Sequence, residues 1–245
     1  MQAPLWLAFL TLIASLAACA SPGESRELQS VLTTLANTPA ENEGMRERNQ
    51  ELVARALANP KAEVMFLGDS ITQGWDFAGK SVWDLEFAPL QAINLGVSGD
   101  RTEHVLWRLQ QGAYDQLRPE LIVMMIGTNN TGHRMDPPED IESGVRAILA
   151  DLRRRYPKAK LAMLAIFPRG ETADDEMRRN NAEANKLLAP LAREFGAEWL
   201  DLNRAFVDSK GVLSKELMPD LLHPNERGYD AWANAMRQAI TRWMR

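Results

Sequence analysis

The chain has 245 residues, of which 45% are hydrophobic and 25% are charged, an ordinary composition for a globular protein. This balance excludes a chain that is disordered over most of its length, because disordered chains are poor in hydrophobic residues. The net charge of -5 argues against a nucleic-acid partner, since binding to phosphates requires clustered positive charge. We therefore expect one compact domain once a removable N-terminal segment is set aside.

Residues 1–18 have the pattern of an export signal. An apolar run extends from Leu5 to Ala18 and is too short to cross a bilayer comfortably, although it is not preceded by the usual Lys or Arg. Its end, Leu16–Cys19, resembles the lipobox of bacterial lipoproteins, in which the cysteine receives the lipid. Cys19 is the only cysteine, so it has no partner for an internal disulfide. We expect an exported protein of the cell envelope, attached to a membrane through lipidated Cys19 on its periplasmic or extracellular side.

Residues 19–60 are predicted to be a tether followed by a lead-in helix. The polar stretch 38–49 offers no apolar stripe that could be buried. A short helix after it is indicated by apolar residues at helical spacing, namely Leu52, Val53, Ala56 and Leu57. Pro60 ends this helix, and we place the main domain at residues 61–245.

The main domain alternates short apolar runs with longer amphipathic patterns. The runs are nearly continuous in hydrophobicity, as expected for strands covered on both faces, and they span 64–67, 92–95, 121–126, 161–167 and 199–202. Helices are predicted over 102–110, 136–156, 174–195 and 225–244. In the second of these helices Asp136 is the expected cap and Pro137 the expected first residue. The alternation predicts an α/β protein with a five-stranded parallel sheet, a flavodoxin-like three-layer α/β/α sandwich.

Polar sequences follow the predicted strands, where ligands of open parallel sheets bind. They are Gly68-Asp69-Ser70, Gly96-Val97-Ser98-Gly99, Gly127-Thr128-Asn129-Asn130 and Phe167-Pro168-Arg169-Gly170, and Asp220-Leu221-Leu222-His223 precedes the last helix. A nucleophilic serine requires a base within hydrogen-bond reach and a third group that orients this base. Ser70 follows a glycine on a strand-to-helix turn, a position that suits a nucleophile but equally a simple helix cap.

The histidines narrow the choice of base, because only three are present. His104 falls within a predicted helix, and His133 has no carboxylate at a spacing that would orient it. His223 follows Asp220 by three residues, so the carboxylate and the imidazole can meet within one turn. Ser70, His223 and Asp220 are therefore the candidate catalytic residues.

Four blocks of the sequence, in the family's order, resemble the SGNH (GDSL-like) hydrolases over residues 62–245. The blocks are Gly68–Thr72, Asn94–Asp100, Gly127–Asn130 and Asp220–Pro224. The longer string Asn94–Leu109 and Pro168–Gly170 further resemble the catalytic-subunit branch of the platelet-activating-factor acetylhydrolases. The resemblance implies the SGNH hydrolase fold and a carboxylic ester hydrolase that needs no obligatory cofactor.

Residue by residue, the resemblance implies Ser70 as nucleophile, His223 as base and Asp220 as the residue that orients it. The oxyanion donors would be the backbone N–H groups of Ser70 and Gly99 and the side-chain amide of Asn129. Glycine at 99 lets the backbone approach a substrate closely, and an amide donates without carrying a charge. Further candidates for contact with the substrate are Asp100, Asn130 and Arg169.

We expect hydrolysis of short acyl esters, acetyl esters above all, carried by a small molecule, a glycan or a lipid. A lysophospholipase or lipid esterase of the same mechanism is the nearest alternative, because the acyl pocket depends on loop shapes. A metal-dependent phosphoesterase is a more distant alternative, with ligands drawn from Asp69, Asp100, Asn129, Asp220 and His223. Three scattered histidines are few for that chemistry, and no metal is expected. A non-catalytic envelope-binding lipoprotein would lack part of the constellation, and no part is missing.

Overall fold

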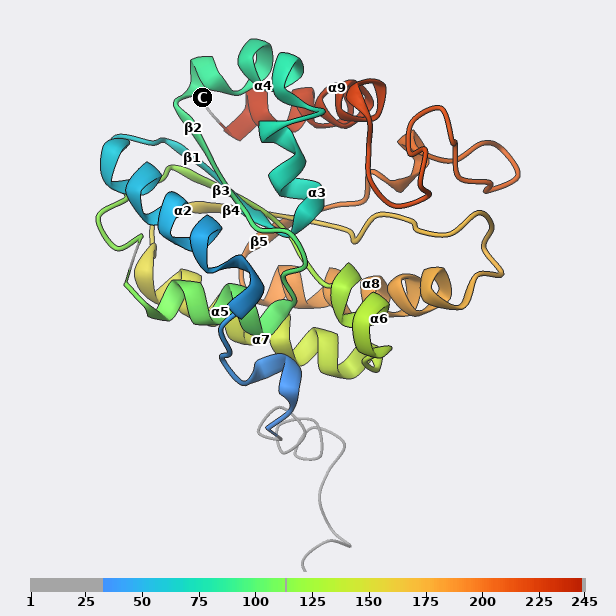
Figure 1. Ribbon diagram of the computed structural model, residues 1–245, viewed down its shortest axis with the longest axis horizontal. Coiled ribbons are helices and arrows are strands. Elements are labelled where there is room, and N and C mark those ends of the chain that lie inside the picture. Colours follow the sequence, from blue (N-terminus) through green and yellow to red (C-terminus); the bar gives the residue numbers. More distant parts are fainter. Residues whose placement is uncertain (1–32, 113, 244–245) are drawn as a thin grey trace, which may run out of the picture. The chain divides into compact units, whose positions relative to one another are not determined.

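The computed structural model describes residues 33–112 and 114–243, so the predicted signal segment and Cys19 lie outside the described residues. The main compact unit begins at Thr34. Its centre is a parallel sheet of five strands in the order β2-β1-β3-β4-β5, with helices on both faces (Figure 1). The predicted α/β/α sandwich is confirmed.

The five strands follow the predicted apolar runs closely. They are β1 (Val64–Gly68), β2 (Ala92–Gly96), β3 (Leu121–Met125), β4 (Lys160–Leu164) and β5 (Ala197–Leu200). The last strand begins two residues before the run that predicted it. Gly68 is in register with Gly96 and with Met125, so the chain leaves β2, β1 and β3 at the same edge of the sheet.

Two hydrophobic cores lie on opposite faces of the sheet, because successive side chains of each strand point to opposite sides. One core contains residues of α2 (Arg46–Ala58), α5 (Thr102–Gln110), α7 (Pro138–Arg155) and α8 (Glu176–Glu194). The other contains residues of α3 (Ser70–Gln73), α4 (Lys80–Glu86) and α9 (Glu226–Trp243). In β1, Met65 and Leu67 face the first core, and Val64 and Phe66 face the second.

The second core joins the elements on either side of the site. Tyr229 of α9 donates its hydroxyl hydrogen to the Ile71 carbonyl of α3 at 2.7 Å. Its ring also lies against Trp75, with a centroid separation of 4.5 Å. The short α3 is thereby fixed to the helix that follows the predicted base.

Three local predictions differ from the structure. The helix α7 begins at Pro138 with Pro137 as its cap, whereas Asp136 accepts hydrogen bonds from Arg134 Nε and Asn130 Nδ2, both at 2.9 Å. The short helices α4 and α6 (Thr128–Arg134) were not predicted. Each is too short to display a helical hydrophobic period.

The third difference concerns residues 34–60: the predicted lead-in helix is present as α2, but the whole segment belongs to the compact unit, including the part predicted to be a tether. Thr34–Met45, here called the N-terminal strap, lies against the helices that follow β2 and β3. The Thr102 hydroxyl donates to the Ala36 carbonyl at 2.8 Å, and Asn37 Nδ2 donates to the Ser143 hydroxyl at 2.7 Å. Because hydrogen bonds attach the strap to the body, its polar sequence needs no apolar stripe.

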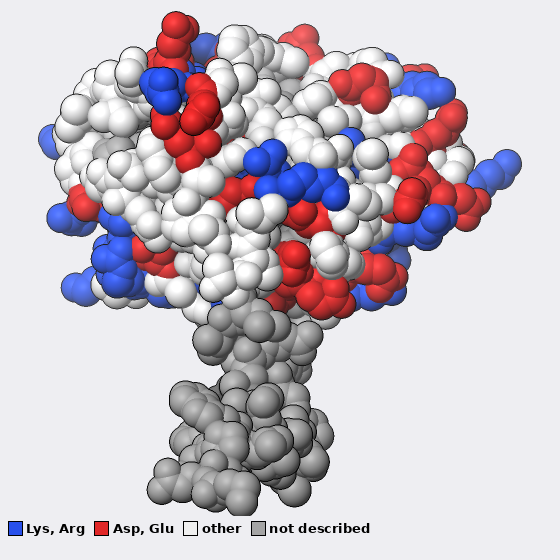
Figure 2. Space-filling model, turned by 60° about the horizontal axis from the view of Figure 1, so that its bottom comes forward, with Lys and Arg blue, Asp and Glu red and all other residues white. Residues whose placement is uncertain are grey.

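Charged side chains of both signs are mixed on the surface. On the face shown in Figure 2, basic and acidic side chains lie next to one another rather than gathering by sign. Ion pairs of the surface include Arg46 Nε with Glu41 Oε1 at 2.9 Å and Arg146 Nη2 with Glu142 Oε1 at 2.7 Å. None of the helices described for this chain is both long and apolar enough to cross a membrane.

Candidate active site

Ser70, His223 and Asp220 form a row of hydrogen bonds. Ser70 Oγ lies 2.9 Å from His223 Nε2, and His223 Nδ1 lies 2.7 Å from Asp220 Oδ2. The other carboxylate oxygen, Asp220 Oδ1, accepts the backbone N–H of His223 at 2.7 Å. With Nδ1–H donated to Asp220, Nε2 is the ring nitrogen that can accept a proton from Ser70.

The loop that presents His223 is fixed at both ends. Leu221 adopts a left-handed conformation with φ +60°, and its carbonyl accepts the N–H of Gly170 at 3.0 Å, which joins the loop to the segment after β4. After His223, the Asn225 side chain accepts the N–H of Gly228 at 3.0 Å in the first turn of α9. The imidazole is therefore positioned by a turn before it and a helix start after it.

Asp220 is kept ionised by its hydrogen bonds. Partial burial alone would raise the pKa of this carboxyl, but the amide and ring N–H groups of His223 outweigh burial and lower the pKa below its ordinary value. An ionised carboxylate against Nδ1 stabilises the imidazolium that forms when His223 takes a proton.

Ser70 is the first residue of α3, directly after β1. Asp69 caps this helix, because its Oδ1 accepts the Ile71 N–H at 2.9 Å. Burial raises the pKa of Asp69 to about 7, and its Oδ2 has no hydrogen-bond partner among the described residues. The helix cap and the start of the helix thus place the Ser70 hydroxyl at the edge of the sheet, with its side chain partly exposed.

The groups predicted to bind an oxyanion follow three adjacent strands. Gly99, after β2, has φ +72°, a backbone conformation that favours glycine. Asn129, after β3, donates one N–H of its side-chain amide to the Asp100 carbonyl at 3.0 Å. This bond fixes the plane of the amide and leaves its second N–H as a further donor. Together with the amide of Ser70 after β1, these donors lie along the edge that carries His223.

Two residues predicted to contact a substrate have buried side chains in this structure. Asp100 and Asn130 are each 0% exposed. Asp100 Oδ2 accepts from Arg108 Nε at 2.9 Å, and Asn130 Oδ1 accepts the Thr102 N–H at 3.0 Å. Both side chains therefore brace the loops, and their contact with a substrate stays a prediction. Arg169 is half-buried and donates to the Thr128 carbonyl at 2.8 Å.

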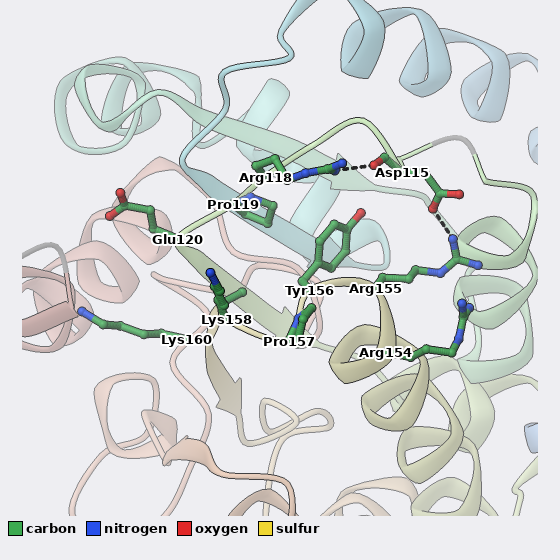
Figure 3. Close-up of a pocket in the computed structure, with 11 residues that line it drawn as sticks. Asp115, Arg118, Pro119, Glu120, Arg154, Arg155, Tyr156, Pro157, Lys158 and Lys160 are labelled. Carbon is green, nitrogen blue, oxygen red and sulfur yellow. Dashed lines mark hydrogen bonds and ion pairs between the residues drawn. The ribbon is translucent and has the colours of Figure 1, made fainter.

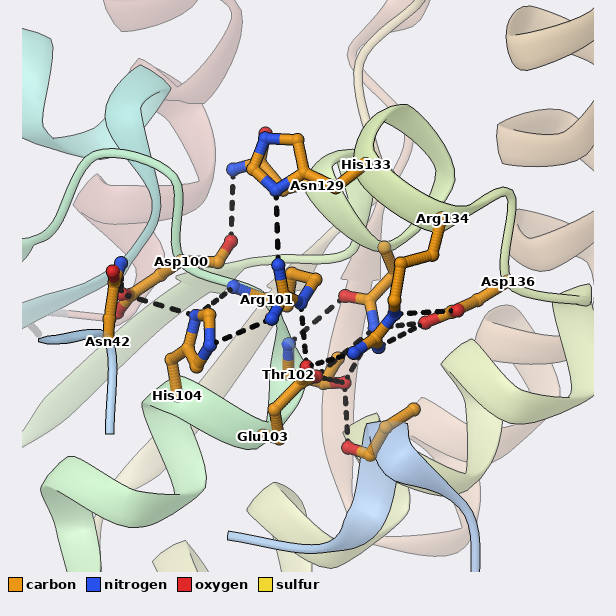
Figure 4. Close-up of polar contacts among 12 residues, drawn as sticks. Asn42, Asp100, Arg101, Thr102, Glu103, His104, Asn129, His133, Arg134 and Asp136 are labelled. Atoms are coloured by element: carbon orange, nitrogen blue, oxygen red, sulfur yellow. Dashed lines mark hydrogen bonds and ion pairs between the residues drawn. The ribbon is translucent and has the colours of Figure 1, made fainter. Parts of the chain in front are cut away.

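Two residues that fix the loop after β2 were not predicted from the sequence. Asn42 Nδ2 donates to the Ser98 carbonyl at 3.2 Å and to Asp100 Oδ1 at 3.0 Å (Figure 4). On the other side, the Gln73 side chain accepts the Ser98 N–H at 2.6 Å. Asn42 lies in a polar stretch without periodicity, and Gln73 lies in a helix of four residues, so neither position carries a pattern that a sequence reveals.

The other two histidines do not contact Ser70 within the described part of the chain. Burial, together with the charge of Arg101, lowers the pKa of His104 to about 4. His133 Nδ1 lies 3.2 Å from Arg101 Nη1 (Figure 4), and burial together with Arg101 also lowers its pKa. Both rings are therefore neutral at pH 7, and the row that ends at Ser70 includes neither of them.

The described residues contain no cluster of metal ligands, and one broad depression lies away from this site. Across residues 33–112 and 114–243, no three His, Cys, Asp or Glu side chains group as ligands for a metal ion. A depression of about 760 Å³ lies where β3 and β4 begin, at the opposite end of the sheet (Figure 3). Its lining includes Arg118, Tyr156 and Lys158 and none of the predicted site residues.

Comparison with known proteins identifies the family. The model of the GDSL-like lipase/acylhydrolase family matches residues 66–231. The chain belongs to this family. Among curated relatives of this acylhydrolase, human platelet-activating factor acetylhydrolase IB subunit alpha1 is 37% identical over 181 residues, which are 74% of this chain and 76% of the relative. Subunit alpha2 from Rattus norvegicus is 38% identical over 179 residues, or 73% and 76% of the two chains.

Solved structures share the fold of this acylhydrolase. A GDSL-like lipase from Bacteroides thetaiotaomicron superposes with a TM-score of 0.67 at 19% identity, covering 79% of this chain and 97% of the other. An acetylxylan esterase from Geobacillus stearothermophilus superposes with a TM-score of 0.60 at 20% identity, covering 72% of this chain and 93% of the esterase. The predicted SGNH family is thus confirmed, and as a member of it the chain is a carboxylic ester hydrolase.

Proposed function

We propose that this acylhydrolase cleaves short acyl esters, acetyl esters above all, with Ser70 as its nucleophile. The observation that carries the proposal is the row of hydrogen bonds from Ser70 Oγ to His223 at 2.9 Å and from His223 to Asp220 at 2.7 Å. The names of its relatives support the acyl group, because one is an acetylhydrolase and a structural neighbour is an acetylxylan esterase.

Acylation begins when Ser70 Oγ attacks the carbonyl carbon of the ester and His223 Nε2 takes the hydroxyl proton. The carbonyl oxygen becomes an oxyanion, which accepts hydrogen bonds from the N–H groups of Ser70 and Gly99 and from Asn129 Nδ2. The intermediate collapses, the bond to the alcohol oxygen breaks, and His223 donates its proton to the leaving alcohol. The acyl group remains on Ser70, and Asp220 stabilises the imidazolium during both transfers.

Deacylation repeats these steps with water. His223 Nε2 takes a proton from a water molecule, whose oxygen attacks the acyl carbon on Ser70. The same three donors hold the second oxyanion, and its collapse releases the carboxylic acid while His223 returns the proton to Ser70 Oγ. The cycle thus ends with the free hydroxyl.

The test is hydrolysis of nitrophenyl esters from acetyl to long acyl chains by the parent, by Ser70→Ala and by the parent with a chelator. We expect activity confined to short chains, unaffected by the chelator, and a loss on the order of 10⁴-fold or more in kcat for Ser70→Ala. Activity extending to long chains would favour a lipid esterase of the same mechanism. Activity that survives in Ser70→Ala but is lost in the chelator would replace the proposal with a metal-dependent hydrolase.

A further inference from the structure

The N-terminal strap contacts the peptide that would supply one oxyanion donor. Asn42 Nδ2 donates to the Ser98 carbonyl at 3.2 Å and to Asp100 Oδ1 at 3.0 Å. These two acceptors lie on either side of Gly99 in the chain. Figure 4 shows Asn42 beside Asp100, on a segment remote in sequence from the loop that it binds.

The Ser98 carbonyl and the Gly99 N–H belong to the same peptide group. This group is planar and trans, so a hydrogen bond that fixes the carbonyl also fixes the direction of the N–H on the opposite side. A carbonyl that accepts a hydrogen bond is polarised, which strengthens the attached N–H as a donor. Without such a contact, a glycine at φ +72° has the widest freedom to rotate the donor away.

Both segments that Asn42 joins, the strap and the loop after β2, are held in place by other hydrogen bonds. The strap is attached to the body by the bonds of Ala36 to Thr102 and of Asn37 to Ser143, at 2.8 and 2.7 Å, and the Ala40 N–H donates to the Glu103 carbonyl at 3.3 Å. On the loop side, Asp100 is fixed by Arg108, whose Nε lies 2.9 Å from Asp100 Oδ2. Asn42 therefore joins two segments that are each anchored independently.

We propose that Asn42 is a positioning residue that aims the Gly99 N–H at the oxyanion. The inference rests on the proposed function and extends it, because it assigns a role in the reaction to a segment that precedes the whole sheet. Asn42 itself does not touch the reacting atoms. It acts through the Ser98–Gly99 peptide.

The test compares Asn42→Ala with Asn37→Ala, a control that removes bonds of the same strap to Ser143 and to the Thr34 N–H, neither of which involves the loop after β2. Rates are measured for nitrophenyl acetate and for its thiono analogue, in which C=S replaces C=O. Sulfur is the weaker hydrogen-bond acceptor, so the ratio of the two rates reports on the oxyanion donors and does not depend on the fraction of folded protein.

For Asn42→Ala we expect kcat for the oxygen ester to fall about tenfold at unchanged KM, less than the loss typical of deleting a donor outright. The oxygen-to-sulfur ratio should fall by a similar factor, and Asn37→Ala should change neither quantity.

An unchanged ratio in Asn42→Ala would overturn the inference, and so would an equal fall in Asn37→Ala, which would assign the effect to the strap as a whole. Asn42→Asp provides a second variant, since it keeps the shape and removes both donated hydrogens; it should lower the ratio too, and an unchanged ratio there counts against the inference. Ser70→Ala distinguishes a failure of the proposed function from a failure of the role assigned to Asn42. If that variant stays active, the proposed function fails, whereas an inactive Ser70→Ala with an unchanged ratio in the Asn42 variants refutes only the role of Asn42.

Discussion

At the scale of single residues, Asp69 combines a helix cap with a buried, unpartnered carboxyl oxygen in the residue before Ser70. Its Oδ1 accepts the Ile71 N–H at 2.9 Å, and its Oδ2 is buried without a partner among the described residues. Burial raises its pKa from an ordinary 3.8 to about 7. The folded state therefore keeps the proton up to neutral pH, while the unfolded chain releases it above pH 4. Stability is fully present below the unfolded pKa and is lost as the pH rises towards 7.

Asp69→Asn keeps the Oδ1 acceptor and removes the titration. We expect the variant to lack the fall in unfolding free energy between pH 4 and 7, which amounts to about 4 kcal/mol for a shift of this size. Urea unfolding at pH 5 and at pH 8 captures about 3 kcal/mol of this fall, because the loss has already begun at pH 5; Asp174→Asn is the control at an exposed carboxylate. The account of Asp69 fails if the variant and the parent differ by the same amount at both pH values.

At the scale of elements, two glycines of one strand–loop segment are required for different reasons. A Cβ at Gly96 would lie 2.2 Å from the backbone nitrogen of Gln73, because α3 packs directly on the backbone of β2. A Cβ at Gly99 would meet nothing closer than 3.8 Å, but its φ of +72° is unfavourable for any residue with a side chain.

We expect Gly96→Ala to destabilise the protein, because backbone must shift to make room. Gly99→Ala should cost only about 1–2 kcal/mol of stability but reduce kcat strongly, since the displaced N–H is the proposed oxyanion donor. Thermal unfolding and nitrophenyl acetate hydrolysis, measured on both variants, separate the two effects. Normal kcat in folded Gly99→Ala would remove this residue from the oxyanion site.

Elements long enough to show a hydrophobic period were predicted well from the sequence. The four long helices and five strands appear near their predicted ranges, and α5 has the predicted bounds of Thr102–Gln110. The predicted donor residues share one edge because parallel strands all end there, and the loop before α9 brings His223 to Ser70 at this edge. What escaped prediction depends on hydrogen bonds between distant segments. Asn42 reaches Asp100 across 58 positions of the chain, and the buried pairing of Asp100 with Arg108 is equally invisible in a local pattern.

At the scale of the whole molecule, the site is built from residues of the compact unit that begins at Thr34. The predicted lipid attachment at Cys19 lies before that unit. In a bacterial host we expect the protein to incorporate labelled fatty acid and to sediment with membranes. Cys19→Ser should abolish both and leave hydrolysis of nitrophenyl acetate unchanged. Fatty-acid labelling that persists in Cys19→Ser would contradict attachment at this residue.

Covalent capture shows whether Ser70 is a nucleophile activated by His223. A fluorophosphonate places a tetrahedral phosphorus where the ester carbon would lie, so Ser70 Oγ forms a bond to phosphorus as fluoride leaves. We expect one adduct for each chain, located on Ser70 by peptide mass spectrometry, with activity lost in proportion to labelling and no adduct in His223→Ala. An adduct on another residue, or full activity in a completely labelled protein, would rule out Ser70 as the nucleophile.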